Sequence, residues 1–136
     1  MIVDSSAVIA ILQNEPERPS FVEAIENATV RLMSIANWVE CCTVMESRRR
    51  SEGLRDLDRL IGRARIQLAP VDLEQGRLAR EGFTRFGKGR HPARLNYGDC
   101  FAYALASQSG EPLLCKGHDF LKTDITLAPV ASRPIH

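Results

Sequence analysis

Short apolar segments alternate with segments of helical periodicity along the chain, and this alternation restricts the fold more than any other feature. Residues 1–3 are apolar and stop at Asp4, as expected of a short buried strand. Similar segments predict further strands at residues 29–33, 66–70, 112–115 and 125–127. Because strands alternate with helices, the sequence predicts an α/β domain whose mostly parallel sheet carries helices on both faces.

Local capping and breaking signals bound the predicted helices. Ser5 and Ser6 are candidate caps for an apolar, buried helix over residues 7–13. Ser34 begins a long helix that runs to about Arg49, and Gly53 marks a break after it. The other helices are predicted at residues 19–26, 54–61, 72–86 and 100–107, with Gly110 ending the last.

Its length of 136 residues limits the chain to one compact domain over residues 1–136. Its 18 Lys and Arg against 17 Asp and Glu leave a net charge of +1, so nucleic acid would have to bind through a local basic patch. The four cysteines form no C-x-x-C pair, which is typical neither of a zinc site nor of a disulfide framework. We expect a cytoplasmic protein without a secretory signal or membrane span, because no basic-then-apolar leader and no long apolar run is present.

Four acidic residues stand apart because apolar sequence surrounds each of them: Asp4, Glu40, Asp99 and Asp119. Acidic side chains are almost never fully buried unless they are paired or bind a metal. Each also has an ordinary interpretation: Asp4 and Asp99 as helix caps, Glu40 as a half-exposed helix residue, Asp119 as a turn residue. These roles are compatible with convergence at one site.

If the four carboxylates converge, cations must relieve their repulsion or some of them must be protonated. Carboxylate oxygens are the ligands that Mg²⁺ and Mn²⁺ prefer. Such an ion can lower the pKa of a bound water and stabilise a leaving oxygen, which suits phosphodiester hydrolysis without a protein nucleophile.

Three motifs along the chain together carry a family resemblance. The opening Met-Ile-Val-Asp-Ser-Ser-Ala-Val is similar to the first strand and Asp of the PIN-domain ribonucleases that act as toxins of VapBC toxin–antitoxin pairs. The segment Leu-Asn-Tyr-Gly-Asp-Cys-Phe-Ala-Tyr-Ala-Leu-Ala at residues 95–106 and the segment Leu-Leu-Cys-Lys-Gly-His-Asp-Phe at 113–120 are the more specific matches. The loop at residues 86–91 is typical of one branch. The resemblance implies a three-layer α/β/α PIN-like domain.

Carried over by position, the family's acidic quartet falls on the four residues selected above. The resemblance implies that Asp4, Asp99 and Asp119 bind Mg²⁺ or Mn²⁺, while Glu40 completes the catalytic set. Ser6 matches a hydroxyl residue that supports the first Asp. Asp124 stays open as an additional carboxylate or as a replacement for Asp119.

Basic residues near these acids are candidate RNA contacts. Lys88, Arg90, His91 and Arg94 lie in the stretch that leads to Asp99, and we predict that its Lys and Arg side chains bind phosphate. A solvated loop is the alternative. Lys116 is a further candidate for phosphate, or for pairing with an acid.

Three other features have ordinary interpretations that we favour. The run Arg48–Arg50 complements a helix dipole, with RNA contact as the alternative. His118 is expected in a turn rather than as a general acid, and Trp38 in the core rather than as a platform for bases.

The sequence therefore predicts a Mg²⁺- or Mn²⁺-dependent endoribonuclease toxin that a VapB-type antitoxin inhibits. A homodimer is expected, which would become a heterotetramer or larger assembly with the antitoxin. A non-catalytic RNA- or protein-binding PIN domain is the alternative. A dehalogenase-like phosphatase is disfavoured because Ser6 stands where it would need a second Asp. A receiver domain is disfavoured because no acidic pair precedes Asp4.

Overall fold

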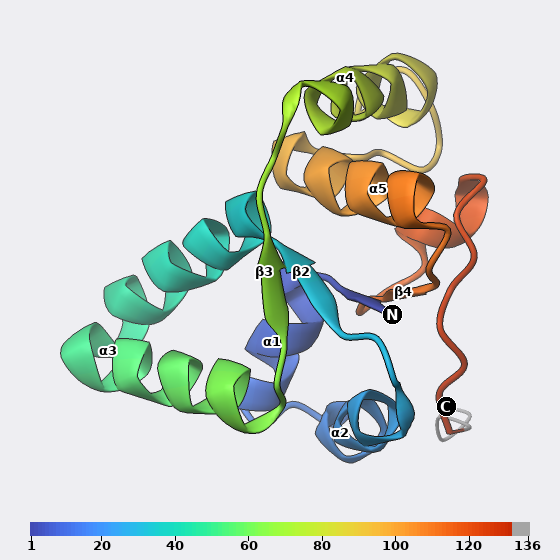
Figure 1. Cartoon of the computed structure of the whole chain (residues 1–136). Helices are drawn as coiled ribbons and strands as arrows, with labels where there is room; N and C mark the ends of the chain where they lie inside the picture. The colour runs from blue at the N-terminus through green and yellow to red at the C-terminus, as the bar shows by residue number, and fades with distance from the viewer. Residues whose placement is uncertain (132–136) are drawn as a thin grey trace.

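In the computed structural model, which describes residues 1–131, a parallel sheet lies between two layers of helices (Figure 1). The strands are β1 (Ile2–Val3), β2 (Leu32–Ser34), β3 (Gln67–Ala69) and β4 (Leu113–Leu114). They are ordered β3-β2-β1-β4, and every pair is parallel. Leu127 forms a parallel bridge to Leu113, so the predicted fifth strand is present only as this short pairing. The fold is thus the predicted α/β class.

Five α-helices and one 3₁₀ helix connect and follow the strands within the described residues. They are α1 (Ser5–Leu12), α2 (Arg18–Asn27), α3 (Ile35–Arg63), α4 (Leu73–Phe86), α5 (Tyr97–Ser109) and η1 (Asp119–Lys122). In Figure 1, α4 and α5 cover one face of the sheet, whereas α1, α2 and α3 lie on the other side. The predicted three-layer α/β/α arrangement is confirmed.

Alternate residues of each short strand supply the two hydrophobic cores. In β1, Ile2 packs into the core beneath α4 and α5, and Val3 packs into the core beneath α1–α3. In β4, Leu113 and Leu114 divide in the same way. This period of two follows from the pleat of a strand, and it fixes each strand's register because a shift by one residue would exchange the two cores.

The helix α3 is a hairpin of two helical arms rather than one continuous rod. Its break lies at Arg50, which has φ 55° and ψ −139°. The prediction of a break was right, but its position at Gly53 was wrong. Gly53 instead lies where the two arms touch, because a Cβ built on it would stand 2.4 Å from the carbonyl oxygen of Met45. Figure 1 shows the hairpin projecting from the sheet.

Two helices begin earlier than the sequence indicated, because the residue that caps each lies earlier in the chain. Asp4, which the sequence offered as a cap besides Ser5 and Ser6, caps α1 by accepting a hydrogen bond from the backbone of Ser6 at 3.1 Å. Asn96 caps α5 by accepting from the backbone N–H of Asp99. Asp99 is therefore the third residue of this helix, where its carboxylate accepts from the backbone of Asn96 and completes a capping box.

Among residues 1–131, no helix is both long enough and apolar enough to cross a bilayer.

Candidate active site

Asp4 lies at the carboxyl end of the central strand β1 and is 2% exposed. Its Oδ2 accepts hydrogen bonds from the hydroxyl and the backbone N–H of Ser6, at 2.6 and 3.1 Å. Its Oδ1 is buried and has no partner among the described residues. The pKa of Asp4 is raised to about 6, chiefly by burial and in addition by the negative charges of Asp99 and Glu40, against the lowering effect of the hydrogen bonds from Ser6. When Asp4 is ionised, its incompletely solvated carboxylate therefore lowers the stability of the folded protein.

Glu40 reaches the same region from the first arm of α3. Its Oε1 accepts from the hydroxyl of Ser5 at 2.6 Å and, more weakly, from Nδ2 of Asn37 at 3.4 Å. The same amide of Asn37 donates to the backbone carbonyl of Gly98 at 2.9 Å. This buried amide therefore ties the start of α5 to α3 beside the carboxylate of Glu40.

Asp99 joins the site from the first turn of α5. Burial raises its pKa, and the negative charges of Glu40 and Asp119 act in the same direction. Asp119 is exposed at the start of η1. Mutual repulsion therefore links all four acids, because the negative charges of Asp99 and Glu40 also act on Asp4. The tertiary structure brings together the four residues that the sequence singled out.

The donor chemistry at this edge fits a hard divalent cation. The site offers carboxylate oxygens, one of them buried and unpartnered, and a negative charge that a cation would neutralise. Within residues 1–131, however, no group of three His, Cys, Asp or Glu side chains is positioned to hold an ion. Asp4 and Asp99 would therefore have to approach Asp119 or Glu40 more closely in order to share one.

Ser6 links the first carboxylate to the end of β4. Its Oγ donates to Asp4 and accepts the backbone N–H of Lys116 at 2.9 Å. The ammonium group of Lys116 pairs with Glu15 and lies 3.6 Å from Glu17. Lys116 is thus engaged with acids of the loop between α1 and α2, the second of the two roles considered for it.

Asp124 lies apart from the four acids. Its Oδ2 is 3.1 Å from Nη1 of Arg85, a residue of α4. Burial, followed by a hydrogen bond with Asp124, raises the pKa of Tyr103 to about 12. Asp124 therefore braces α4 and α5, while Asp119 is the residue that interacts with Asp99.

The basic stretch before α5 is an ordered loop. Leu95 and Gly87 close it, with the N–H of Lys88 donating to the carbonyl of Leu95 at 2.9 Å. The ring of His91 stacks edge-on against Phe86 at 5.1 Å between centroids. Among its candidate RNA contacts, Arg90 lies over the ring of Phe83 at 5.2 Å, while Lys88 and Arg94 are exposed.

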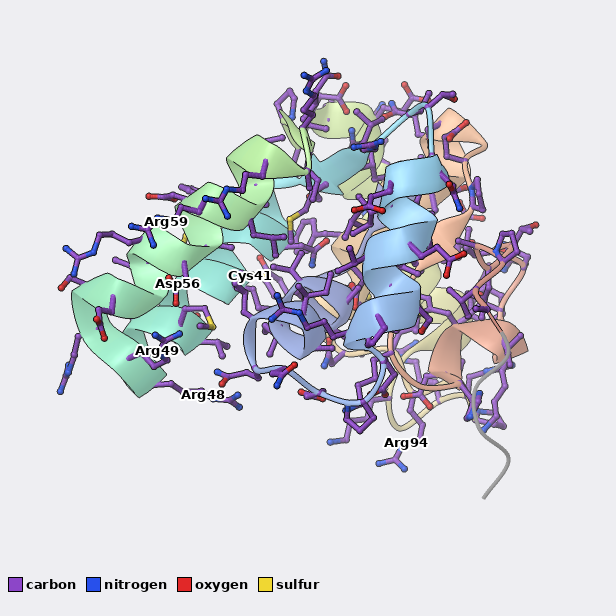
Figure 2. All side chains as sticks on the ribbon, turned by 90° about the horizontal axis from the view of Figure 1, so that it is seen from below. Cys41, Arg48, Arg49, Asp56, Arg59 and Arg94 are labelled. Atoms are coloured by element: carbon purple, nitrogen blue, oxygen red, sulfur yellow. The ribbon has the colours of Figure 1, made fainter. Side chains whose placement is uncertain are left out.

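Two arginines far apart in sequence extend from one side of the molecule. Figure 2 shows Arg48, near the tip of the α3 hairpin, and Arg94, in the basic loop, both projecting toward the lower edge of the view. The neighbouring Arg49 instead pairs with Asp56 of the second arm at 2.6 Å. The run Arg48–Arg50 thus lies at a helix end as predicted, but one of its members holds the hairpin closed.

The remaining sequence candidates have ordinary environments. Trp38 is half-buried and packs against the core beneath α1–α3, which confirms its structural interpretation. His118 is exposed directly before η1.

Asn37 and Gly98 were not among the site residues predicted from the sequence. The hydrogen bond from Ser5 to Glu40 was not predicted either. The sequence signal for these contacts was the amide of Asn37, which lies one helical turn before Glu40.

The sequence and the fold match a known class. Residues 1–125 match the PIN domain family. The crystal structure of VapC20 from Mycobacterium tuberculosis, described as a toxin that cleaves the sarcin–ricin loop, superposes with a TM-score of 0.77 at 13% identity over 96% of this chain and 98% of that one. A Rickettsia felis VapBC2 structure, bound to a DNA fragment from its promoter, gives a TM-score of 0.71 at 11% identity, with 96% and 98% covered.

Curated relatives indicate which branch of the PIN domain family the chain belongs to. The ribonuclease VapC of Mycolicibacterium smegmatis is 48% identical over 125 residues, which cover 92% of this chain and 97% of the relative. Ribonuclease VapC30 of Mycobacterium tuberculosis is 47% identical, with 92% and 95% covered. Ribonuclease VapC28 of the same species is 47% identical over 129 residues, with 94% and 97% covered. The chain therefore belongs to the PIN-domain family, on its VapC branch.

Proposed function

We propose that this protein is the toxin of a toxin–antitoxin pair and hydrolyses RNA internally, with Mg²⁺ or Mn²⁺ as cofactor. Its similarity to relatives named ribonuclease VapC supports the reaction class. The observation that carries the metal-dependent part is the unpartnered, buried Oδ1 of Asp4 beside the carboxylates of Asp99 and Glu40. A protein retains such a repulsive group when a ligand stabilises it.

The four acids would have distinct roles in this reaction. Asp4, Asp99 and Asp119 would hold the cation, which supplies an activated water and stabilises the leaving oxygen. Glu40, held by Ser5 and Asn37, would orient water at the site. Ser6 fixes Oδ2 of Asp4 and so leaves Oδ1 free to bind.

RNA must approach an acidic centre, so nearby cations have to offset its repulsion. The exposed Lys88 and Arg94 are the best-placed residues of the basic loop, and Arg90 would contact RNA after leaving Phe83. Lys116 is a weaker candidate, because Glu15 and Glu17 already neutralise its charge.

The partners would be an RNA substrate and a VapB-type antitoxin that blocks the site. The antitoxin is supported by the solved VapBC2 complex to which this fold is similar. We propose that the toxin works in the cytoplasm as a homodimer, and that the antitoxin-bound form is a heterotetramer or larger.

Cellular RNA incubated with the purified protein tests this function. We expect discrete cleavage with Mg²⁺ or Mn²⁺, no cleavage with EDTA, and none by Asp99→Asn. Asp58→Asn, which changes an exposed acid of α3 in the same way, should cleave like the wild type. Cleavage that persists in EDTA or in Asp99→Asn would contradict the proposal. RNA binding without cleavage by the folded wild type would instead support a non-catalytic PIN domain.

A further inference from the structure

A cavity of about 690 Å³ opens at the end of the sheet opposite the four acids. It is lined by residues 28–31, which lead into β2, and by Arg63, Arg65 and Gln67 at the start of β3. Because all strands are parallel, this is the amino edge of the sheet, whereas Asp4 follows the carboxyl end of β1. The cavity is therefore separate from the candidate active site.

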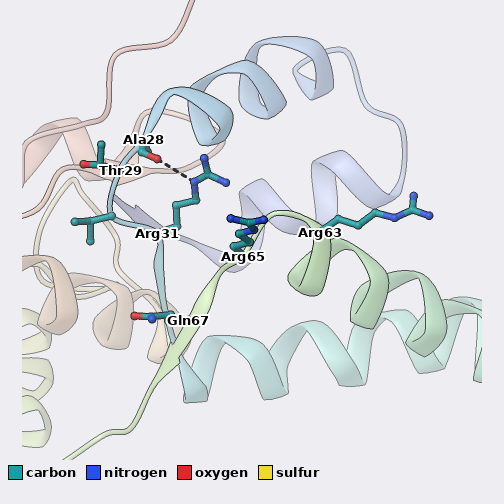
Figure 3. A pocket seen from close by; sticks show the side chains of 7 residues that line it. Ala28, Thr29, Arg31, Arg63, Arg65 and Gln67 are labelled. Atoms are coloured by element: carbon teal, nitrogen blue, oxygen red, sulfur yellow. Dashed lines mark hydrogen bonds between the residues drawn. The ribbon is translucent and has the colours of Figure 1, made fainter.

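Three arginines line this cavity, and no acidic residue does. Arg31 donates to the backbone carbonyls of Glu26, Ala28 and Ala64, at 2.8 to 2.9 Å. These carbonyls lie at the ends of α2 and α3, so they fix the guanidinium group in place without removing its charge. Figure 3 shows the bond to Ala28 and the position of Arg31 beside Arg65 in the view.

The other two arginines are exposed, and no ion pair or hydrogen bond engages their side chains within residues 1–131. Figure 3 shows Arg63 reaching outward from the end of α3. Arg65 has φ 52°, a left-handed conformation that a non-glycine residue seldom adopts. That backbone turn carries the chain from α3 into β3 and keeps Arg65 on the cavity. Strained positions of this kind often mark functional sites.

Glu26 is a carboxylate that could compete for these cations. It is exposed on α2 and lines a neighbouring groove together with Arg31 and Arg63. Because none of the residues that line the cavity is acidic, the three guanidinium groups give it a net positive charge. Thr29 and Gln67 add polar side chains at the cavity. Arginine combined with neutral hydrogen-bonding groups is typical of sites that bind phosphate.

We infer that this cavity binds backbone phosphates of the RNA at a distance from the bond that is cut. The inference rests on the proposed ribonuclease function. A folded RNA would contact both edges of the sheet, whereas a short single strand would reach only the acidic site. The cavity would thus favour structured substrates by binding, without taking part in the reaction.

The test compares Arg63→Gln/Arg65→Gln with Arg55→Gln/Arg77→Gln. The second pair removes two exposed arginines that also lack partners among residues 1–131, so both variants lose equal charge. KM and kcat are measured on a structured RNA and on a short single strand that contains its cleavage site. We expect Arg63→Gln/Arg65→Gln to raise KM several-fold for the structured RNA alone, with kcat unchanged. The slope of its log affinity for the structured RNA against log salt should become shallower by about 1.8, or about 0.9 for each lost contact.

Equal effects of the two variants, or an unchanged KM for the structured RNA, would overturn the inference while leaving the ribonuclease function intact. If the wild type cleaves neither RNA, the proposed function fails instead. In that case, fluorescence anisotropy of labelled structured RNA still measures the affinity of the two variants for this RNA. Glu26→Gln should tighten binding of that RNA, and unchanged or weaker binding by this variant would count against the inference.

Discussion

Gly98 lies against the carboxylate of Glu40, so closely that a Cβ on Gly98 would stand 2.4 Å from Oε2 and 2.8 Å from Oε1. The absence of a side chain at this position lets the start of α5 approach α3, and the amide of Asn37 holds that approach. Gly98 thus determines where Glu40 can lie.

Gly98→Ala should therefore lower RNA cleavage while the protein stays folded. The carboxylate is the end of a flexible side chain, so it would move aside rather than unfold the helix. Alanine itself favours a helix over glycine by up to about 1 kcal/mol. We expect cleavage to fall by about tenfold, or about 1.4 kcal/mol in the barrier, with an unchanged or slightly higher midpoint of thermal unfolding. Gly62→Ala is the control, because a Cβ there meets nothing within 4 Å. Equal cleavage by the two variants would contradict this account of Glu40.

Stability without divalent ions should depend on pH through Asp4. Its folded-state pKa is about 6 against an ordinary 3.8, so between these values the folded protein binds more protons than the unfolded chain. Stability is then greatest below pH 3.8 as far as Asp4 contributes, and it falls as pH rises toward 6. The loss is on the order of 3 kcal/mol. Urea unfolding in EDTA, compared between wild type and Asp4→Asn, measures it. Asp4→Asn should lack this part of the pH dependence, and identical profiles would show that Asp4 does not carry it.

Divalent cations should stabilise the wild type at neutral pH, because they would relieve the repulsion among Asp4, Asp99 and Glu40. Binding to the folded state alone adds about 2.7 kcal/mol at a concentration 100 times the Kd. Thermal unfolding in Mn²⁺, Mg²⁺ and EDTA should show a higher midpoint with either ion. Asp4→Asn and Asp99→Asn should show little response. A shift of equal size in these variants would place the ion elsewhere.

One pair of substitutions distinguishes whether Asp119 or Asp124 is the fourth acid of the site. Asp119 acts on Asp99 electrostatically, whereas Asp124 pairs with Arg85 and Tyr103. We expect Asp119→Asn to reduce cleavage strongly and Asp124→Asn to leave it near the wild-type level. The loss of the half-exposed pair with Arg85 should cost at most about 1 kcal/mol in stability. The reverse pattern of activities would make Asp124 the fourth acid.

Gly53→Ala should destabilise the α3 hairpin. The new Cβ would meet the backbone carbonyl of Met45 at 2.4 Å, and backbone cannot move aside as a side-chain end can. We expect a loss of about 1–3 kcal/mol in the free energy of unfolding, which chemical denaturation would measure. Gly62→Ala again serves as the control, since it lies in the same arm of α3 with open space around it. A variant as stable as this control would disprove the close contact.

Much of the fold follows from local signals in the sequence. The strand–helix alternation gives the α/β class, since residues 2–3 and 113–114 are continuous apolar runs typical of buried parallel strands. Helix ends were less predictable, because neighbouring residues compete to cap a helix. Asp4, Ser5 and Ser6 were all candidate caps of α1, and Asp4 is the residue that caps it. Asn96 caps α5 in place of Asp99. The local sequence does not determine which of these polar side chains caps the helix.

The sequence by itself singled out four carboxylates, Asp4, Glu40, Asp99 and Asp119, because apolar sequence flanks each of them. The burial that such flanks suggest is found at Asp4, whereas Asp119 is exposed. Only the tertiary structure decided how they are held. The bond from Ser5 to Glu40 spans 35 positions, and the bond from the amide of Asn37 to Gly98 spans 61. The cluster of Arg31, Arg63 and Arg65 likewise appears only after β2 and β3 pair. Hydrogen bonds and charges act through space, so their partners are known only once packing has fixed the distances between distant segments.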